Sequence, residues 1–183
     1  MTTRKSQIRT AITPLLVLVA LSSWDNGGAQ QNSDDKPVVI SATLKTSGYI
    51  SGEFRPVDNA KAQVQGGCNE SFANFGLIYE DKTWRKVSVT VMTKDGISSS
   101  QVGPIALDWA LVSFMDSSYD ATQFKGPAQF IISKHDAATS RMVGTVKGSL
   151  PGYGGLMGGD VPPDQSIDFE FTFEMIAVCG SDG

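Results

Sequence analysis

Ile167-Asp-Phe-Glu-Phe-Thr-Phe-Glu-Met-Ile-Ala-Val178 is the stretch that decides the fold of this chain. From Ile167 to Met175 every second residue is large and apolar, and the residues between them are polar. Because successive side chains of a β-strand point to opposite faces of a sheet, this period of two predicts a strand with one buried and one exposed face. The buried face must form part of a hydrophobic core.

Other stretches earlier in the chain show the same alternation, and turn residues separate them. We expect strands at 38–45, 49–54, 75–80, 84–93, from about 97, at 104–115, at 128–134 and at 141–150. The segment 104–115 also fits a helical spacing, and we favour the strand. Several short strands with no convincing helix predict an all-β fold, namely an antiparallel β-sandwich, with a small β-barrel as the alternative.

The alternation also predicts which side chains face inward. In the first strand we expect Val38, Ile40, Ala42 and Leu44 on one face, with the turn to the next strand at 46–48. In the strand 84–93 we expect the valines inside and Trp84 outside. Gly144 and Gly148 fall on the apolar face of their strand and leave room for aromatic rings of the final strand.

The first 29 residues have the pattern of a secretory signal peptide: a basic start, an apolar stretch at 11–21, and then small and polar residues. That stretch is too short to span a membrane, and we expect no transmembrane segment in the mature protein. The polar composition of residues 30–36 predicts a disordered lead, and we expect residues 37–183 to form a single β domain. The expected location is therefore periplasmic or extracellular.

Charge excludes one class of partner. The whole chain has a net charge of −4, and without residues 1–29 it carries 12 basic against 18 acidic residues. Nucleic-acid binding requires a basic surface, so we expect no nucleic-acid partner.

Two cysteines, Cys68 and Cys179, belong to the expected mature part. An even pair in an exported chain predicts a disulfide bond. A metal site or a reactive thiol is the alternative, but His135 is the only histidine available as a further ligand.

Acidic residues line the exposed face of the final strand and the loop before it. A calcium site formed by Asp160, Asp164 and Asp168 is one interpretation, and a pair of catalytic carboxylates is another. Alternation alone produces such a row, and basic residues of the strand 141–150 would meet it across the ladder. We therefore favour a solvated face and expect no cofactor.

Aromatic residues suggest a ligand platform, for which we single out Trp84 and Tyr153. His135 beside Asp136 suggests a catalytic triad, but no serine lies in a nucleophile elbow, and neighbouring residues of a strand point to opposite faces. We identify no catalytic residues, and an enzyme is the less favoured interpretation.

These patterns lead to three functional hypotheses. The favoured one is an exported, non-enzymatic β-sandwich protein that binds a protein or glycan partner at the cell surface or in the envelope. The alternatives are a structural or assembly subunit that pairs through sheet edges, and a hydrolase that acts on an extracellular polymer. No motif in the chain is specific enough to name a family.

Overall fold

The computed structural model describes residues 37–59, 62–65, 72–78, 83–97, 101–136, 138–154, 161–162 and 164–176. They belong to one compact unit, residues 31–183. The expected signal peptide, the polar lead, Cys68 and Cys179 lie outside the described residues. The leader and the disulfide therefore stay predictions.

Six of the strands form one antiparallel sheet, here called sheet A, in the order β2-β1-β11-β10-β9-β6. Its strands are β1 (Val38–Gly48), β2 (Gly52–Phe54), β6 (Gly103–Ile105), β9 (Gln129–Asp136), β10 (Arg141–Pro151) and β11 (Ser166–Ile176). The other five form sheet B, also antiparallel, in the order β3-β4-β5-β7-β8. Its strands are β3 (Gln63–Gln65), β4 (Phe72–Ile78), β5 (Lys86–Thr93), β7 (Leu107–Met115) and β8 (Ala121–Gly126).

The chain is all-β over its described part, where no α-helix occurs. Within that part there is accordingly no helix of the length and hydropathy needed to cross a membrane. The segment 104–115 is strand rather than helix, as expected, and is divided between β6 and β7.

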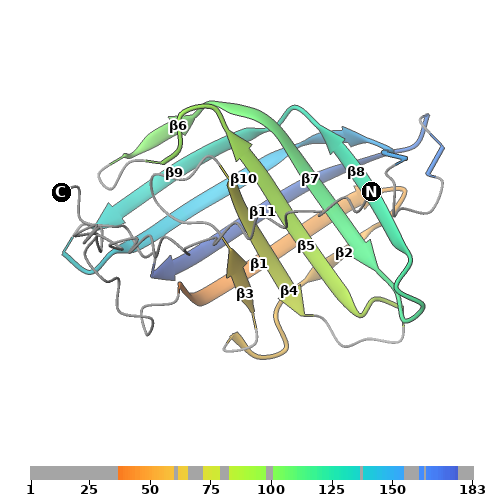
Figure 1. The fold of residues 1–183 in the computed structure, drawn as a ribbon, viewed down its shortest axis with the longest axis horizontal. Helices are drawn as coiled ribbons and strands as arrows, with labels where there is room; N and C mark the ends of the chain where they lie inside the picture. Colours follow the sequence, from red (N-terminus) through yellow and green to blue (C-terminus); the bar gives the residue numbers. More distant parts are fainter. Residues whose placement is uncertain are drawn as a thin grey trace, which may run out of the picture. The chain divides into compact units, whose positions relative to one another are not determined.

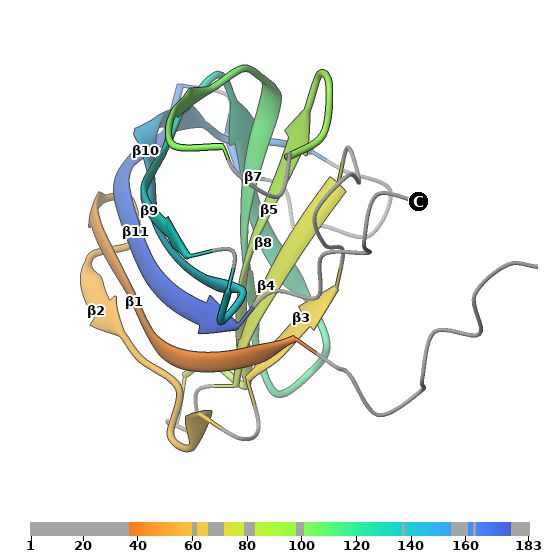
Figure 2. The ribbon, with the colours of Figure 1, turned by 90° about the vertical axis from the view of Figure 1, so that its left-hand side faces the viewer.

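The two sheets face each other across one hydrophobic core (Figure 1). Sheet A contributes fully buried side chains such as Leu44 and Phe171, and sheet B contributes Val89 and Phe114. Figure 2 shows that the strands of sheet A curve around this core. The chain passes from sheet A to sheet B between β6 and β7, and Gly152, just after β10, bridges to Phe124 of β8.

The position of β11 confirms the sequence prediction for the final strand. It lies between β1 and β10 and is paired with both of them along its whole length. Its burial alternates strictly up to Phe173, with Phe169, Phe171 and Phe173 inside. The most regular amphipathic stretch of the sequence is thus a central strand of the larger sheet.

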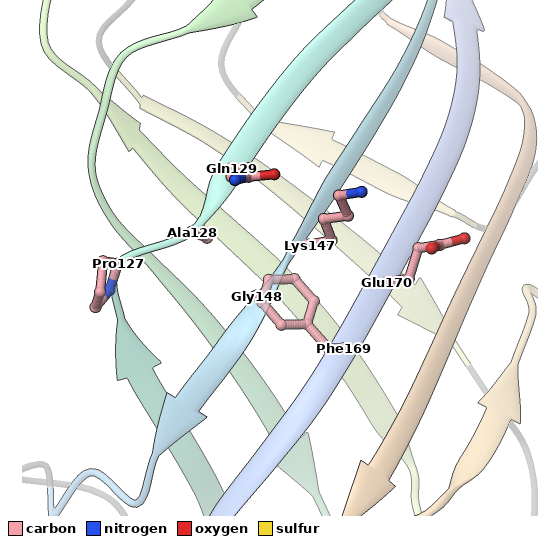
Figure 3. Close-up of a pocket in the computed structure, with 7 residues that line it drawn as sticks. All are labelled: Pro127, Ala128, Gln129, Lys147, Gly148, Phe169 and Glu170. Atoms are coloured by element: carbon pink, nitrogen blue, oxygen red, sulfur yellow. The ribbon is translucent and has the colours of Figure 1, made fainter.

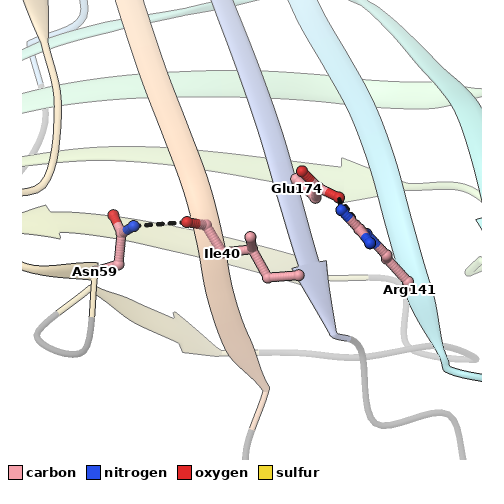
Figure 4. A network of polar contacts seen from close by, with 4 residues as sticks. All are labelled: Ile40, Asn59, Arg141 and Glu174. Atoms are coloured by element: carbon pink, nitrogen blue, oxygen red, sulfur yellow. Dashed lines mark hydrogen bonds and ion pairs between the residues drawn. The ribbon is translucent and has the colours of Figure 1, made fainter.

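A β-bulge in β1 makes one prediction wrong. The register with β11 shifts between Val39 and Ser41, so Ile40 is an extra residue. Such an insertion reverses the faces of the residues on one side of it. Val39 is therefore buried in place of Val38, whereas Ala42 and Leu44 face inward as expected. The side-chain amide of Asn59 donates a hydrogen bond of 2.6 Å to the carbonyl oxygen of Ile40 (Figure 4).

Turn positions differ from expectation at two places. β1 continues to Gly48, so its turn to β2 lies at 49–51 rather than at 46–48, although the two strands pair as expected. The strand expected from about residue 97 begins at Gly103, and Ile97 is a buried residue of the connection. Alternation identifies strands well but does not locate their ends.

Gly144 of β10 confirms the expected place for an aromatic ring. It pairs with Phe173 of β11, and a Cβ atom added at Gly144 would lie 2.5 Å from Cζ of that ring. The missing side chain therefore lets the Phe173 ring lie against the backbone of β10. At Gly148 an added Cβ would meet Pro127 and Ala128 at 3.1–3.3 Å instead of a ring of the final strand.

We predict that Gly144→Ala lowers the free energy of unfolding by about 1–3 kcal/mol, because the new methyl group displaces Phe173 from a packed core. Urea denaturation followed by circular dichroism measures the change. Gly154→Ala is the matched control, since no atom lies within 4 Å of its added Cβ. Equal stabilities of the two variants would contradict the packing described for Phe173.

Candidate functional site

Three side chains that carry aromatic or cationic groups meet on the outer face of sheet B. The ammonium nitrogen of Lys125 lies 4.3 Å from the ring centroid of Trp109 and 5.0 Å from that of Tyr153. Trp109 and Lys125 are half-buried, and Tyr153 is exposed. We call Trp109, Lys125 and Tyr153 the aromatic platform.

Strand pairing places the three side chains side by side. Leu111 of β7 pairs with Lys125 of β8, so Trp109 is the diagonal neighbour of Lys125 on the same face. On the other side of β8, the backbone N–H of Tyr153 donates to the carbonyl oxygen of Gln123 at 2.8 Å. Tyr153 thus continues sheet B beyond its edge strand, and the lysine lies between the two rings.

The lysine contacts both rings. A cation within about 6 Å of an aromatic centroid is attracted to the ring face, with about 0.5–1 kcal/mol for an exposed pair. Both distances satisfy this condition. The attraction therefore favours an arrangement in which the two rings lie on either side of the ammonium group.

The two aromatic residues singled out from the sequence have different surroundings. Tyr153 belongs to the platform, whereas Trp84 precedes β5 and is half-buried, with its ring centroid 5.4 Å from that of Phe114 in the core. The expected outward orientation of Trp84 is wrong, because the residue lies before the strand, where alternation does not apply. A ligand-binding role for Trp84 stays a prediction.

Sequence reasoning missed Lys125 as a member of the platform. Its signal would have been the pairing of β7 with β8, which brings a lysine next to Trp109. Tyr153 reaches the platform because its neighbour Gly152 forms a β-bridge with Phe124. The alternation of apolar and polar residues does not predict such a contact.

The acidic face of β11 meets basic residues, as expected. Four neighbouring strands carry a row of alternating charge through their paired residues, Glu53, Lys45, Glu170 and Lys147. Farther along, Arg141 of β10 forms an ion pair with Glu174 (Figure 4). That carboxylate raises the pKa of the Arg141 guanidinium by accepting its hydrogen bond. Opposite charges that meet across a ladder in this way favour the pairing and need no ligand.

Two shallow depressions adjoin this row of charges. One, of about 490 Å³, lies over β9, β10 and β11, with Lys147 and Glu170 at its rim (Figure 3). The other, of about 440 Å³, lies over β1 and β11 and shares Glu170. Lys147 lies opposite Glu170 in the first depression, whereas the second is lined by Asp168 and Glu170 together with Lys45 and is therefore more acidic than basic.

Asp160 of the expected calcium site lies outside the described residues, while Asp164 and Asp168 are both exposed. Asp164 lies in a turn before β11, and Asp168 in β11 itself. Among the described residues no group of three or more histidine, cysteine or acidic side chains is placed to hold a metal ion. The calcium site stays a prediction.

Asp136 shapes the turn that follows β9. Its carboxylate accepts a hydrogen bond of 3.0 Å from the backbone N–H of Ala138. A hydrogen bond from the Thr139 side chain, followed in importance by that of Ala138, lowers the pKa of Asp136 below its usual value. His135, its neighbour, is half-buried in β9. The carboxylate of Asp136 therefore acts in the turn between β9 and β10.

We predict that Asp136→Asn lowers the Tm at neutral pH, because the amide accepts the same bonds without a negative charge. A lowered native pKa means that the charge stabilises the fold above the unfolded-state pKa of about 3.9, and that this stabilisation disappears as the pH falls through the native value. Thermal unfolding across this range should show the two proteins converging below about pH 4. A gap in Tm that persists in acid would contradict this role.

The turn between β7 and β8 holds a second cation–aromatic pair. The Arg85 guanidinium lies 4.6 Å from the ring centroid of Tyr119, whose hydroxyl accepts a hydrogen bond from it at 2.5 Å. Tyr119 has a positive φ of 67°, and Asp116 caps the same turn by accepting from Ser118 and Asp120. The pair stabilises a strained turn.

Comparison with known proteins finds no family model, no curated protein and no solved structure that matches this chain.

Proposed function

We propose that this chain is an exported, non-enzymatic β-sandwich protein that binds a glycan at the cell surface or in the envelope. The aromatic platform carries the proposal, because it presents two rings, held by one lysine, on an outer sheet face. Flat, rigid aromatic faces give large contact area against the apolar C–H faces of pyranose rings at little entropic cost.

Two observations support the sandwich rather than a small closed barrel. The two sheets face each other across one core, and β2 and β6 of sheet A and β3 of sheet B are edge strands, whereas β8 is bridged at one corner by the residues just after β10. A closed barrel would have no edges. The leader-like sequence of residues 1–29 supports export.

The two other functions have less support. Three of the edge strands are three residues long and β8 has six, so each offers few backbone groups to a neighbouring sheet. This weakens the proposal of an assembly subunit. A hydrolase would draw its acid and base from Asp160, Asp164, Asp168, Glu170 and Glu174, but Glu170 lies between two lysines and Glu174 pairs with Arg141.

The test is titration calorimetry of the full-length chain against a panel of neutral and acidic oligosaccharides. We expect at least one of them to bind, and Trp109→Ala or Tyr153→Ala to weaken that binding about tenfold, on the order of 1.4 kcal/mol. Each variant removes one ring from the platform, and thermal unfolding verifies that it remains folded.

Tyr119→Ala is the matched control, since it removes an exposed aromatic side chain from the turn between β7 and β8, at the end of β8 remote from Lys125. Its affinity should equal that of the wild type. If no saccharide binds, or if all three variants bind alike, glycan binding at this platform is wrong, and a protein partner becomes the better proposal.

A further inference from the structure

We propose that the glycan is acidic, with carboxylate or sulfate groups on its pyranose rings, and that Lys125 selects these groups. The inference rests on the proposed function and specifies the class of its ligand. It makes Lys125 a specificity-determining residue rather than only a support for two rings.

The charge of the outer face of sheet B is the first argument. The outward positions on its three strands β5, β7 and β8 are Lys86, Ser88, Thr90, Met92, Trp109, Leu111, Ser113, Met115, Ala121, Gln123 and Lys125. Two of these residues are lysines and none is acidic, while the exposed Asp108 lies at the bulge of β7 just before Trp109. In a chain of net charge −4, this described part of the face is locally positive.

Acidic residues elsewhere on these strands leave Lys125 available. Asp108 is exposed and is the extra residue at a register shift of β7 between Leu107 and Trp109, and it forms no ion pair with Lys125. Asp116 and Asp120 lie in the turn between β7 and β8, at the end of β8 remote from Lys125. The ammonium of Lys125 lies over the two rings, and within the part of the chain that the structure describes no carboxylate forms an ion pair with it.

On the outer face of sheet A, in contrast, cationic side chains lie next to carboxylates. There Lys45 and Lys147 both lie next to Glu170 across the ladder, and Arg141 pairs with Glu174. Cations of sheet A are thus compensated within the sheet. Lys125 has its positive charge next to two apolar rings, which is the combination that an acidic sugar requires.

The geometry allows one ligand to use all three side chains. An ammonium group has three donors, and attraction to a ring face does not use an acceptor lone pair. A carboxylate or sulfate oxygen can therefore accept a hydrogen bond from Lys125 while the sugar ring to which it is attached contacts Trp109 or Tyr153. Two lysines are too few for a nucleic acid, which binds through many phosphate contacts.

Matched pairs of probes test the inference: polygalacturonate against its methyl ester, and dextran sulfate against dextran. Calorimetry with the full-length chain should show tighter binding of at least one acidic member than of its neutral counterpart. Lys125→Met keeps the apolar stem and removes the charge, and should weaken the acidic ligand about fivefold. Affinity for a neutral member should fall by less than that for the acidic member, and added salt should reduce the difference between the two.

Lys147→Met is the control for nonspecific attraction, because it removes an exposed lysine from sheet A. It should leave acidic binding within error of the wild type. Equal binding of neutral and acidic members, or equal effects of the two lysine variants, overturns the inference while glycan binding stands. Binding of neither member of either pair overturns both proposals, and binding of an acidic peptide alone would identify a different ligand class.

Discussion

The structure depends on the pairing of β11 with both β1 and β10 along its whole length. This strand places three phenylalanines in the core and three carboxylates outside, so its two neighbours must complement both faces. On the core side, Gly144 leaves space for the Phe173 ring. On the outer side, Lys45, Lys147 and Arg141 lie next to the carboxylates of β11. A shift of one residue in either pairing would exchange the two faces of β11 against its neighbours.

The outer faces of the two sheets differ because of this constraint. On sheet A the side chains of Lys45, Lys147 and Arg141 lie next to carboxylates of β11. On sheet B the described outward residues of β5, β7 and β8 are neutral or basic, apart from the exposed Asp108 at the bulge of β7, and two rings flank Lys125. Our proposal places the ligand on this second face.

Sequence periodicity predicts the all-β class and most of the strands, because alternation directly reports burial, but it misses β3 and β8. It does not report an inserted residue, so the bulge at Ile40 reversed the expected orientation of Val38 and Val39. Trp84 was misplaced because it lies outside its strand. The aromatic platform combines β7, β8 and the segment after β10, and only the pairing of distant strands brings these residues together.

The most direct test of this account is a backbone amide NMR titration of the isotope-labelled protein with oligogalacturonate. Binding at the platform predicts shifts for the Trp109 indole and for the amides of Gln123, Lys125 and Tyr153, with little change on β1, β10 and β11. Shifts concentrated around Lys147 and Glu170 on sheet A would contradict the account, because they would place the ligand on the charge-balanced face.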